Sequence, residues 1–121
     1  MNQKRAERVA EAMQAELAGL LQREVKDPRI GFVSITRVDL ARDLAVARVY
    51  VSVLDPEKAG ETLLGLKSAK PFLRGEVTRR LRLRQAPDLD FRLDHSLEAS
   101  LTVQRLLKET GAADAEHAGE Y

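Results

Sequence analysis

The alternation of apolar and polar residues predicts a helix at the beginning of the chain. Across residues 3–25 the apolar side chains recur at helical spacing, and charged residues occupy most of the other positions. The residues on this apolar face are Val9, Met13, Leu17, Leu20 and Leu21. Asp27 and Pro28 end the helix, because a residue that precedes proline is disfavoured in helical geometry.

Two strands follow this helix. In residues 31–40 the apolar positions change parity midway, and a β-bulge near Thr36 and Arg37 would reconcile the two halves. Residues 41–43 suit a hairpin turn. Residues 45–54 alternate between apolar and polar side chains and form the most apolar strand, so we expect them in the middle of a sheet.

A second helical region begins at Asp55 and Pro56, where the aspartate suits the N-cap and the proline suits the first helical position. Apolar residues at helical spacing continue through the next thirty positions or so. Pro71 interrupts them, and it removes a backbone donor and collides with the preceding turn. We therefore expect a kink near Ala69 and Pro71 that separates two helices.

The last part of the pattern is a strand and a short helix. Residues 89–94 alternate as a half-buried strand does, and Ser96 can cap a helix that ends near Glu109. Residues 110–121 contain acids but no base and show no periodicity, so we expect a disordered tail. The predicted organisation is one domain over residues 1–109 followed by this tail.

The order of these elements predicts an α+β fold. A strand–helix–strand crossover joins parallel neighbours, so residues 89–94 should pair in parallel with residues 45–54. Residues 31–40 should then lie antiparallel on the other side of the central strand. The helices should cover one face of this three-stranded mixed sheet and leave the other face open or partly covered.

Composition narrows the functional classes. The chain has 121 residues and a formal net charge of +1, which suits a single domain with one core. It contains no cysteine and only two histidines, His95 and His117, so we expect no disulfide and no metal site. We find no signal segment or membrane span and expect a cytoplasmic protein. The glycines form no phosphate-binding or dinucleotide motif, and we expect neither a cofactor nor an enzymatic activity.

Positive charge is concentrated in residues 67–84. Seven of these residues are Lys or Arg and one is acidic. Such clustering raises the local potential and favours a surface that binds a polyanion over the competing interpretation, a solvated helix face. Helical spacing places Lys67, Arg74 and Arg82 beside the apolar stripe and toward solvent, whereas Arg80 falls nearer to the stripe.

Short motifs in a characteristic order extend over most of the chain. They are Arg8–Glu11, Leu20–Gly31, Ala47–Leu54, Phe72–Arg74, Arg80–Arg84, Pro87–Leu89 and Leu93–Leu97. In their order and spacing over residues 5–107, they resemble the ribosome-binding factor A family of bacterial assembly factors for the small ribosomal subunit. The resemblance implies a type II KH-like domain with the order helix, strand, strand, helix, kink, helix, strand.

The resemblance also bears on the kink. Domains of this type usually grip nucleic acid through a Gly-x-x-Gly loop, and no two glycines of this chain lie three positions apart. The family carries an Ala-x-Gly kink instead, which maps onto Ala69, Lys70 and Pro71. Proline stands here where glycine is usual and lacks the N–H donor, so side-chain contacts from Lys70 and Arg74 gain importance.

The function that the resemblance implies is binding of free, immature small (30S) ribosomal subunits. It includes help in late maturation and in processing of the 5′ end of 16S rRNA, with other assembly factors as further partners, and we expect a monomer. The side chains expected to face RNA are Lys67, Lys70, Arg74, Arg79, Arg82 and Arg84. Two alternatives stand beside this hypothesis: a general KH-type RNA-binding protein, and a protein-interaction adaptor without a ribosomal target.

Overall fold

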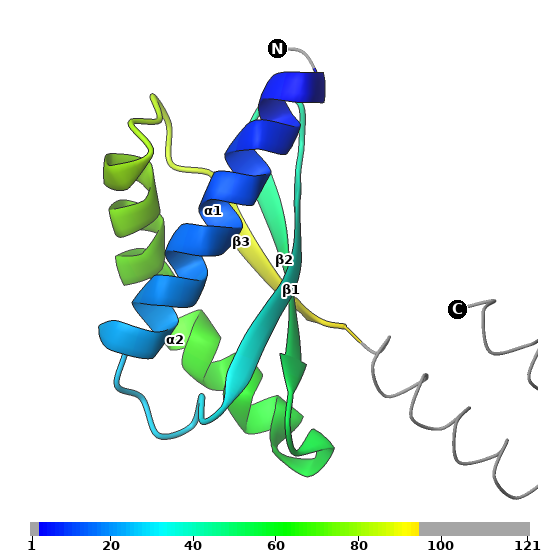
Figure 1. Cartoon of the computed structure of the whole chain (residues 1–121). Helices are drawn as coiled ribbons and strands as arrows, with labels where there is room; N and C mark the ends of the chain where they lie inside the picture. Colours follow the sequence, from blue (N-terminus) through cyan, green and yellow to red (C-terminus); the bar gives the residue numbers. More distant parts are fainter. Residues whose placement is uncertain (1–2, 95–121) are drawn as a thin grey trace, which may run out of the picture.

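The computed structural model describes residues 3–94, and its helices lie on one face of a three-stranded sheet (Figure 1). The elements are α1 (Gln3–Arg23), β1 (Val33–Leu40), β2 (Val46–Val53), the 3₁₀ helix η1 (Pro56–Lys58), α2 (Ala59–Arg80) and β3 (Asp88–Leu93). Their order confirms the predicted α+β arrangement. The short helix expected after Ser96 and the tail expected at residues 110–121 lie outside the described residues.

The sheet has the predicted topology. Its strand order is β1-β2-β3, with β1 and β2 antiparallel and β2 and β3 parallel, so the most apolar strand is central. The pairing of β1 with β2 shifts between Ile35 and Arg37, and this shift confirms the predicted bulge. At the far end of β2, the Asp55 carboxylate accepts a hydrogen bond from Glu57 N at 3.1 Å, which confirms the predicted cap of the next helical segment.

The core lies between the helices and one face of the sheet. Each element contributes side chains at the spacing that its geometry requires, every second residue in the strands and every third or fourth in the helices. The fully buried apolar residues of these elements are Ala6, Met13, Leu17 and Leu20 in α1, Ala47, Val49 and Val51 in β2, Leu66, Leu73 and Val77 in α2, and Leu89 in β3. The opposite face of the sheet carries charges in pairs, such as Arg37 with Asp39 at 3.3 Å.

The helical region after β2 is one helix rather than the two that Pro71 led us to expect. Pro71 lies inside α2, and the two halves of α2 run in different directions in Figure 1. Leu66 precedes Pro71 and Leu73 follows it, yet both side chains are fully buried. The change of direction therefore keeps the apolar stripe of both halves against the sheet.

The end of α2 differs from the sequence prediction. Apolar residues at helical spacing continue for about thirty positions after Pro56, but α2 stops at Arg80. Arg82 has a positive φ of 54°, Arg82 N donates to Arg79 O at 3.3 Å, and Leu83 N donates to Thr78 O at 3.0 Å. This pair of hydrogen bonds is a Schellman motif with Arg82 in its left-handed position. Glycine usually occupies that position, so Arg82 itself does not mark the end of the helix in the sequence.

Candidate nucleic-acid interface

A hollow of about 270 Å³ lies between the first half of α2 and the edge strand β3. Leu63 and Phe91 provide apolar surface above the fully buried Leu89, and Lys67, Lys70 and Asp90 provide charge. We call this hollow the α2–β3 groove. Its three α2 residues are spaced by four and then three positions, so they share one face of the helix. An apolar floor beside two amines can receive a base or ribose while the amines contact phosphates.

The two lysines of the α2–β3 groove differ in their contacts. Lys67 is exposed and forms no hydrogen bond or ion pair within residues 3–94. Lys70 is partly buried, and its Nζ lies 3.4 Å from an Asp88 carboxylate oxygen. This distance is long for a strong ion pair, so Lys70 can exchange Asp88 for an external anion at low cost. Both amines are therefore available to a phosphate.

Arg74 does not point freely into solvent, and this part of the sequence prediction is wrong. Its guanidinium donates from Nε to Pro87 O and from Nη2 to Ala86 O, both at 3.0 Å. These bonds fasten the second half of α2 to the loop that leads into β3. That Arg74 contacts RNA stays a prediction. In the structure, its side chain stabilises the connection between α2 and the loop before β3.

Arg79 and Arg80 share the carboxylate of Glu76. Arg79 is 68% exposed and lies 3.0 Å from Glu76 Oε1. Arg80 is only 26% exposed and also reaches Glu16 at 3.4 Å and Glu24 at 3.1 Å, which belong to α1 and to the residue after it. Arg80 thus connects α2 to α1, and its predicted position near the apolar stripe is confirmed.

These contacts set the ionisation of Glu76. Hydrogen bonds from Arg79 hold the pKa of the Glu76 carboxyl below its usual range, and a bond from Arg80 adds to this effect against the opposing effect of burial. The lowered pKa means that the folded state favours the ionised carboxylate.

We expect the fold to lose stability as the pH falls through the range where ordinary glutamates take up a proton. A carboxyl whose pKa is lower in the folded state stabilises that state above the unfolded pKa, and the contribution disappears as the pH falls toward the folded pKa. Thermal melts from about pH 7 to about pH 3 can compare wild type with Glu76→Gln, which cannot titrate. The variant should show the smaller acid-induced loss, and equal losses would contradict this role of Glu76.

Arg82 and Arg84 lie beyond α2 and line a second hollow of about 440 Å³. Its remaining lining residues are Arg5, Asp43, Leu44, Leu83 and Gln85. We call this hollow the arginine pocket. The structure therefore divides the six sequence candidates: two lysines line the α2–β3 groove, two arginines line the arginine pocket, and Arg74 and Arg79 contact groups of the chain itself. Sequence analysis missed Arg5, which is distant from this stretch along the chain.

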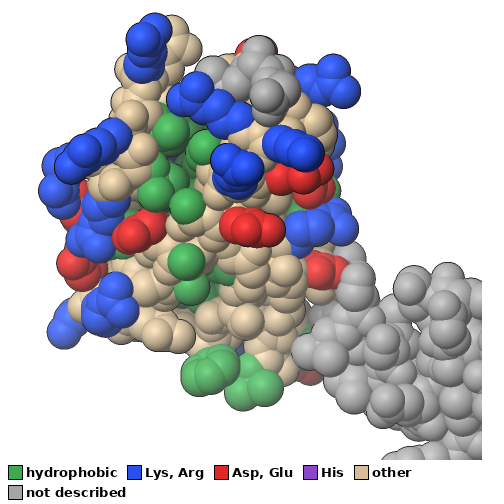
Figure 2. Space-filling view, turned by 45° about the horizontal axis from the view of Figure 1, so that its top comes forward, with side chains coloured by type: hydrophobic (Ala, Val, Ile, Leu, Met, Phe, Trp, Pro, Cys, Tyr) green, Lys and Arg blue, Asp and Glu red, His purple; other side chains and the backbone are tan. Residues whose placement is uncertain are grey.

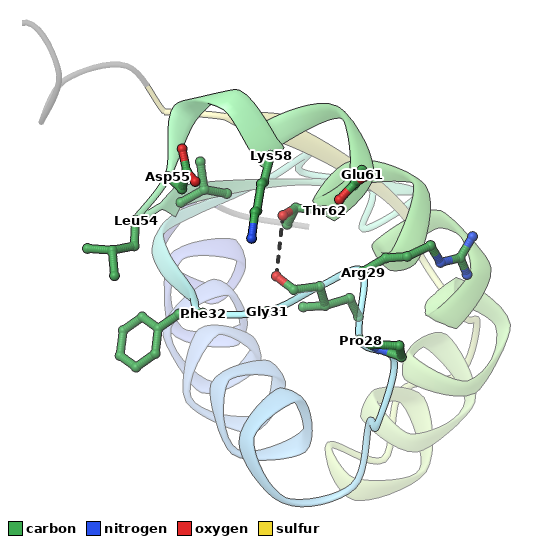
Figure 3. A pocket seen from close by; sticks show the side chains of 11 residues that line it. Pro28, Arg29, Gly31, Phe32, Leu54, Asp55, Lys58, Glu61 and Thr62 are labelled. Atoms are coloured by element: carbon green, nitrogen blue, oxygen red, sulfur yellow. Dashed lines mark hydrogen bonds between the residues drawn. The ribbon is translucent and has the colours of Figure 1, made fainter.

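A third hollow, of about 360 Å³, lies at the other end of the sheet (Figure 3). Its charged lining residues are mixed in sign: Asp55, Lys58 and Glu61 follow one another along the segment after β2, and Arg29 lies on the loop before β1. Phe32 and Leu54 stand at its rim and point outward, with 77% and 81% of their surface exposed. This mixture of charges does not favour a polyanion.

Two further classes of site do not occur within residues 3–94. No group of three or more His, Cys, Asp or Glu side chains in this part of the chain is arranged to hold a metal ion. Neither described helix combines the length and the apolar composition that crossing a membrane requires.

Comparison with known proteins gives consistent matches. The family model for ribosome-binding factor A matches residues 5–107. The crystal structure of ribosome-binding factor A from Thermus thermophilus is 27% identical, with a TM-score of 0.66 over 73% of this chain and 94% of that chain. The solution NMR structure of a putative ribosome binding factor A from Thermotoga maritima is 37% identical, with a TM-score of 0.67 over 76% and 89%.

A further match concerns a complex. It is a homology model of Thermus thermophilus ribosome binding factor A, fitted into the cryo-EM map of a 30S complex with that protein. This model is 29% identical, with a TM-score of 0.60 over 71% of this chain and 91% of that chain. Together the similar structures confirm the α+β fold, with its mixed three-stranded sheet and type II KH-like order of elements.

Proposed function

The chain belongs to the ribosome-binding factor A family, and we propose that it binds immature small (30S) ribosomal subunits. The proposed role includes help in their late maturation and in processing of the 5′ end of 16S rRNA. The similarity to a model fitted into a 30S complex supports the choice of partner. Binding rather than catalysis is the proposed mode of action, since phosphate contacts position a protein on RNA without reaction chemistry.

The observation that carries this proposal is the pair of lysines over the apolar floor of the α2–β3 groove. Lys67 has no partner within residues 3–94, and Lys70 has only the long contact to Asp88. The groove runs beside β3, an edge strand, so an RNA strand can approach from solvent. Its lysines supply the charge, and Phe91 supplies an aromatic surface that can contact a base or ribose.

The other four basic residues predicted to face RNA differ in how available their side chains are. Arg82 and Arg84 remain proposed RNA contacts because neither forms an ion pair or side-chain hydrogen bond within residues 3–94. Arg79 can reach RNA only in competition with Glu76, and Arg74 only by releasing two carbonyl oxygens. We therefore place the first contact at Lys67 and Lys70.

Lys67→Ala combined with Lys70→Ala is expected to weaken binding to purified immature small subunits about tenfold, the equivalent of roughly one charge-assisted hydrogen bond. Wild-type affinity should fall steeply with rising salt, because each neutralised phosphate releases counterions. The double variant should show a salt slope that is flatter by roughly one unit for each lost contact. Fluorescence anisotropy at several salt concentrations measures both quantities.

Lys26→Ala combined with Lys58→Ala is the matched control, since it removes the same charge from two exposed lysines outside the α2–β3 groove. Its affinity should stay close to that of wild type. Equal affinities of the two double variants would contradict the proposed groove. Wild-type protein that binds free single-stranded RNA as tightly as immature subunits would favour the general RNA-binding alternative instead.

A further inference from the structure

Two residues of the described chain hold a backbone conformation that side chains other than glycine rarely adopt. Within residues 3–94, the non-glycine residues with positive φ are Leu44, at 61°, and Arg82, at 54°. Each such residue costs about 1–2 kcal/mol relative to glycine in the same conformation. Both line the arginine pocket, although one belongs to the hairpin loop and the other to the end of α2. Strained residues that meet at one site point to a function there.

Three separate parts of the chain build the arginine pocket. Arg5 comes from the first turns of α1, Asp43 and Leu44 come from the loop between β1 and β2, and the remaining residues follow α2. The hairpin loop is tied to α1, because Arg42 Nε donates to Gln3 Oε1 at 3.3 Å. The loop also has its own hydrogen bond, from Leu44 N to Ala41 O at 2.8 Å. The walls of the pocket are therefore formed before any ligand enters.

The charge of the pocket favours an anion. Three arginines line it against a single aspartate. The Asp43 carboxylate already accepts a hydrogen bond from Ala45 N at 3.0 Å, and this donor of the loop partly compensates its negative charge. Figure 2 shows Lys and Arg side chains gathered at the end of the molecule that carries the beginning of α1. A phosphate approaching this end meets a positive field.

The conformation of Arg82 also favours a binding role for the arginine pocket. A glycine at this position would end α2 through the same Schellman motif without the cost of a left-handed side chain. Arg82 and Arg84 form no ion pair or side-chain hydrogen bond within the described residues, so their guanidinium groups give the fold no contact in return. The strained backbone therefore holds the Arg82 guanidinium at the pocket, with N–H donors that no group within residues 3–94 accepts.

We propose that the arginine pocket binds a phosphate group of the RNA backbone, as a second contact beyond the α2–β3 groove. The planar guanidinium groups of Arg82 and Arg84 can each offer two parallel N–H donors to phosphate oxygens, and Arg5 of α1 also lines the pocket. Leu44 and Leu83 supply apolar surface for the adjacent ribose. This inference rests on the proposed function, and it places the bound RNA along the second half of α2, from the groove to the pocket.

Arg82→Gly is the sharpest test, because it removes the guanidinium and relieves the strain in one change. The melting temperature should stay equal to that of wild type or rise, whereas affinity for purified immature small subunits should fall about three- to tenfold. The salt slope should flatten by roughly one unit. A melting temperature that does not fall would show that unfolding does not explain the weaker binding. Arg84→Ala should weaken binding to a similar extent.

Lys26→Ala is the matched control, since it removes one charge from an exposed side chain that does not line the arginine pocket. It should bind subunits as wild type does. If wild type binds with a steep salt slope but Arg82→Gly and Arg84→Ala both keep wild-type affinity and slope, the pocket proposal is overturned and the proposed function stands. If wild type does not bind subunits at all, both proposals fall.

Discussion

Arg74→Ala is expected to lower the free energy of unfolding by about 2–3 kcal/mol, the scale of hydrogen bonds made by a charged donor. The substitution removes two hydrogen bonds, to Ala86 O and Pro87 O, and thereby releases the loop that leads into β3. Pro87 is buried, so its carbonyl oxygen loses a partner that water replaces poorly. Urea denaturation measures the change in unfolding free energy.

Arg79→Ala is the control for this prediction. It removes the same charge from the same helix, but the Arg79 side chain is 68% exposed and contacts only a neighbouring turn. Its loss should change stability by less than about 1 kcal/mol, as for most exposed ion pairs. Equal midpoints for Arg74→Ala and Arg79→Ala would show that the two bonds to the loop add no stability. Because Arg74→Ala is expected to destabilise the fold, its affinity for RNA must be compared with that of wild type under conditions where both proteins are folded to the same extent.

Gly65→Ala is expected to destabilise the protein by about 1–3 kcal/mol, the usual range for forced overpacking. A Cβ atom at this position would lie 2.7 Å from Ile30 Cγ1 and 3.3 Å from Ile30 N. Ile30 cannot easily move away, because its side chain is buried and its carbonyl accepts a hydrogen bond from Thr62 Oγ1 at 3.3 Å (Figure 3). The clash should outweigh the gain in helix propensity.

Gly75→Ala gives the opposite sign in the same helix. Apart from its chain neighbours and the adjacent backbone of α2, no atom lies within 4 Å of the Cβ that alanine would add there, so only the lower helix propensity of glycine is at stake. The variant should gain about 0.5–1 kcal/mol. Thermal and urea melts of both variants test the pair. A stabilised Gly65→Ala would mean that the loop between α1 and β1 can move away from α2 without cost.

The elements that sequence analysis predicted correctly depend on interactions between near neighbours. The alternation in residues 45–54 follows from burial of one face of a strand, and the parity change near Thr36 requires an extra residue in the ladder. Asp55 caps the turn that follows it. Each of these rules acts within a few positions, so the chain itself displays them.

The features that sequence analysis missed depend on contacts between distant parts of the chain. Helical spacing places Arg74 at the edge of the apolar stripe, but only the fold shows that the carbonyl oxygens of the next loop lie within its reach. Leu81 and Leu83 continue the apolar pattern, although α2 has already ended at Arg80. A glycine in the left-handed position after α2 would have indicated this end in the sequence, but Arg82 occupies that position.

The candidate site was also predictable only in part, since the sequence shows its basic residues but not the distant residues that lie beside them. Lys67 and Lys70 stand out as basic residues at helical spacing, yet the apolar surface beside them includes Phe91 from β3. The arginine pocket combines Arg5 with residues about eighty positions later in the chain. Charge clustering therefore indicates the class of partner, whereas the fold decides which charges act together.

During synthesis, β2 leaves the ribosome long before the strand that covers its second edge. β1 can pair with β2 as soon as both have emerged, because only a short loop joins them. β3 follows only after η1 and the whole of α2. Until then β2, the most apolar strand, presents a row of unpaired N–H and C=O groups to its surroundings. A nascent chain that stalls within α2 therefore exposes the centre of its own sheet as a template for aggregation.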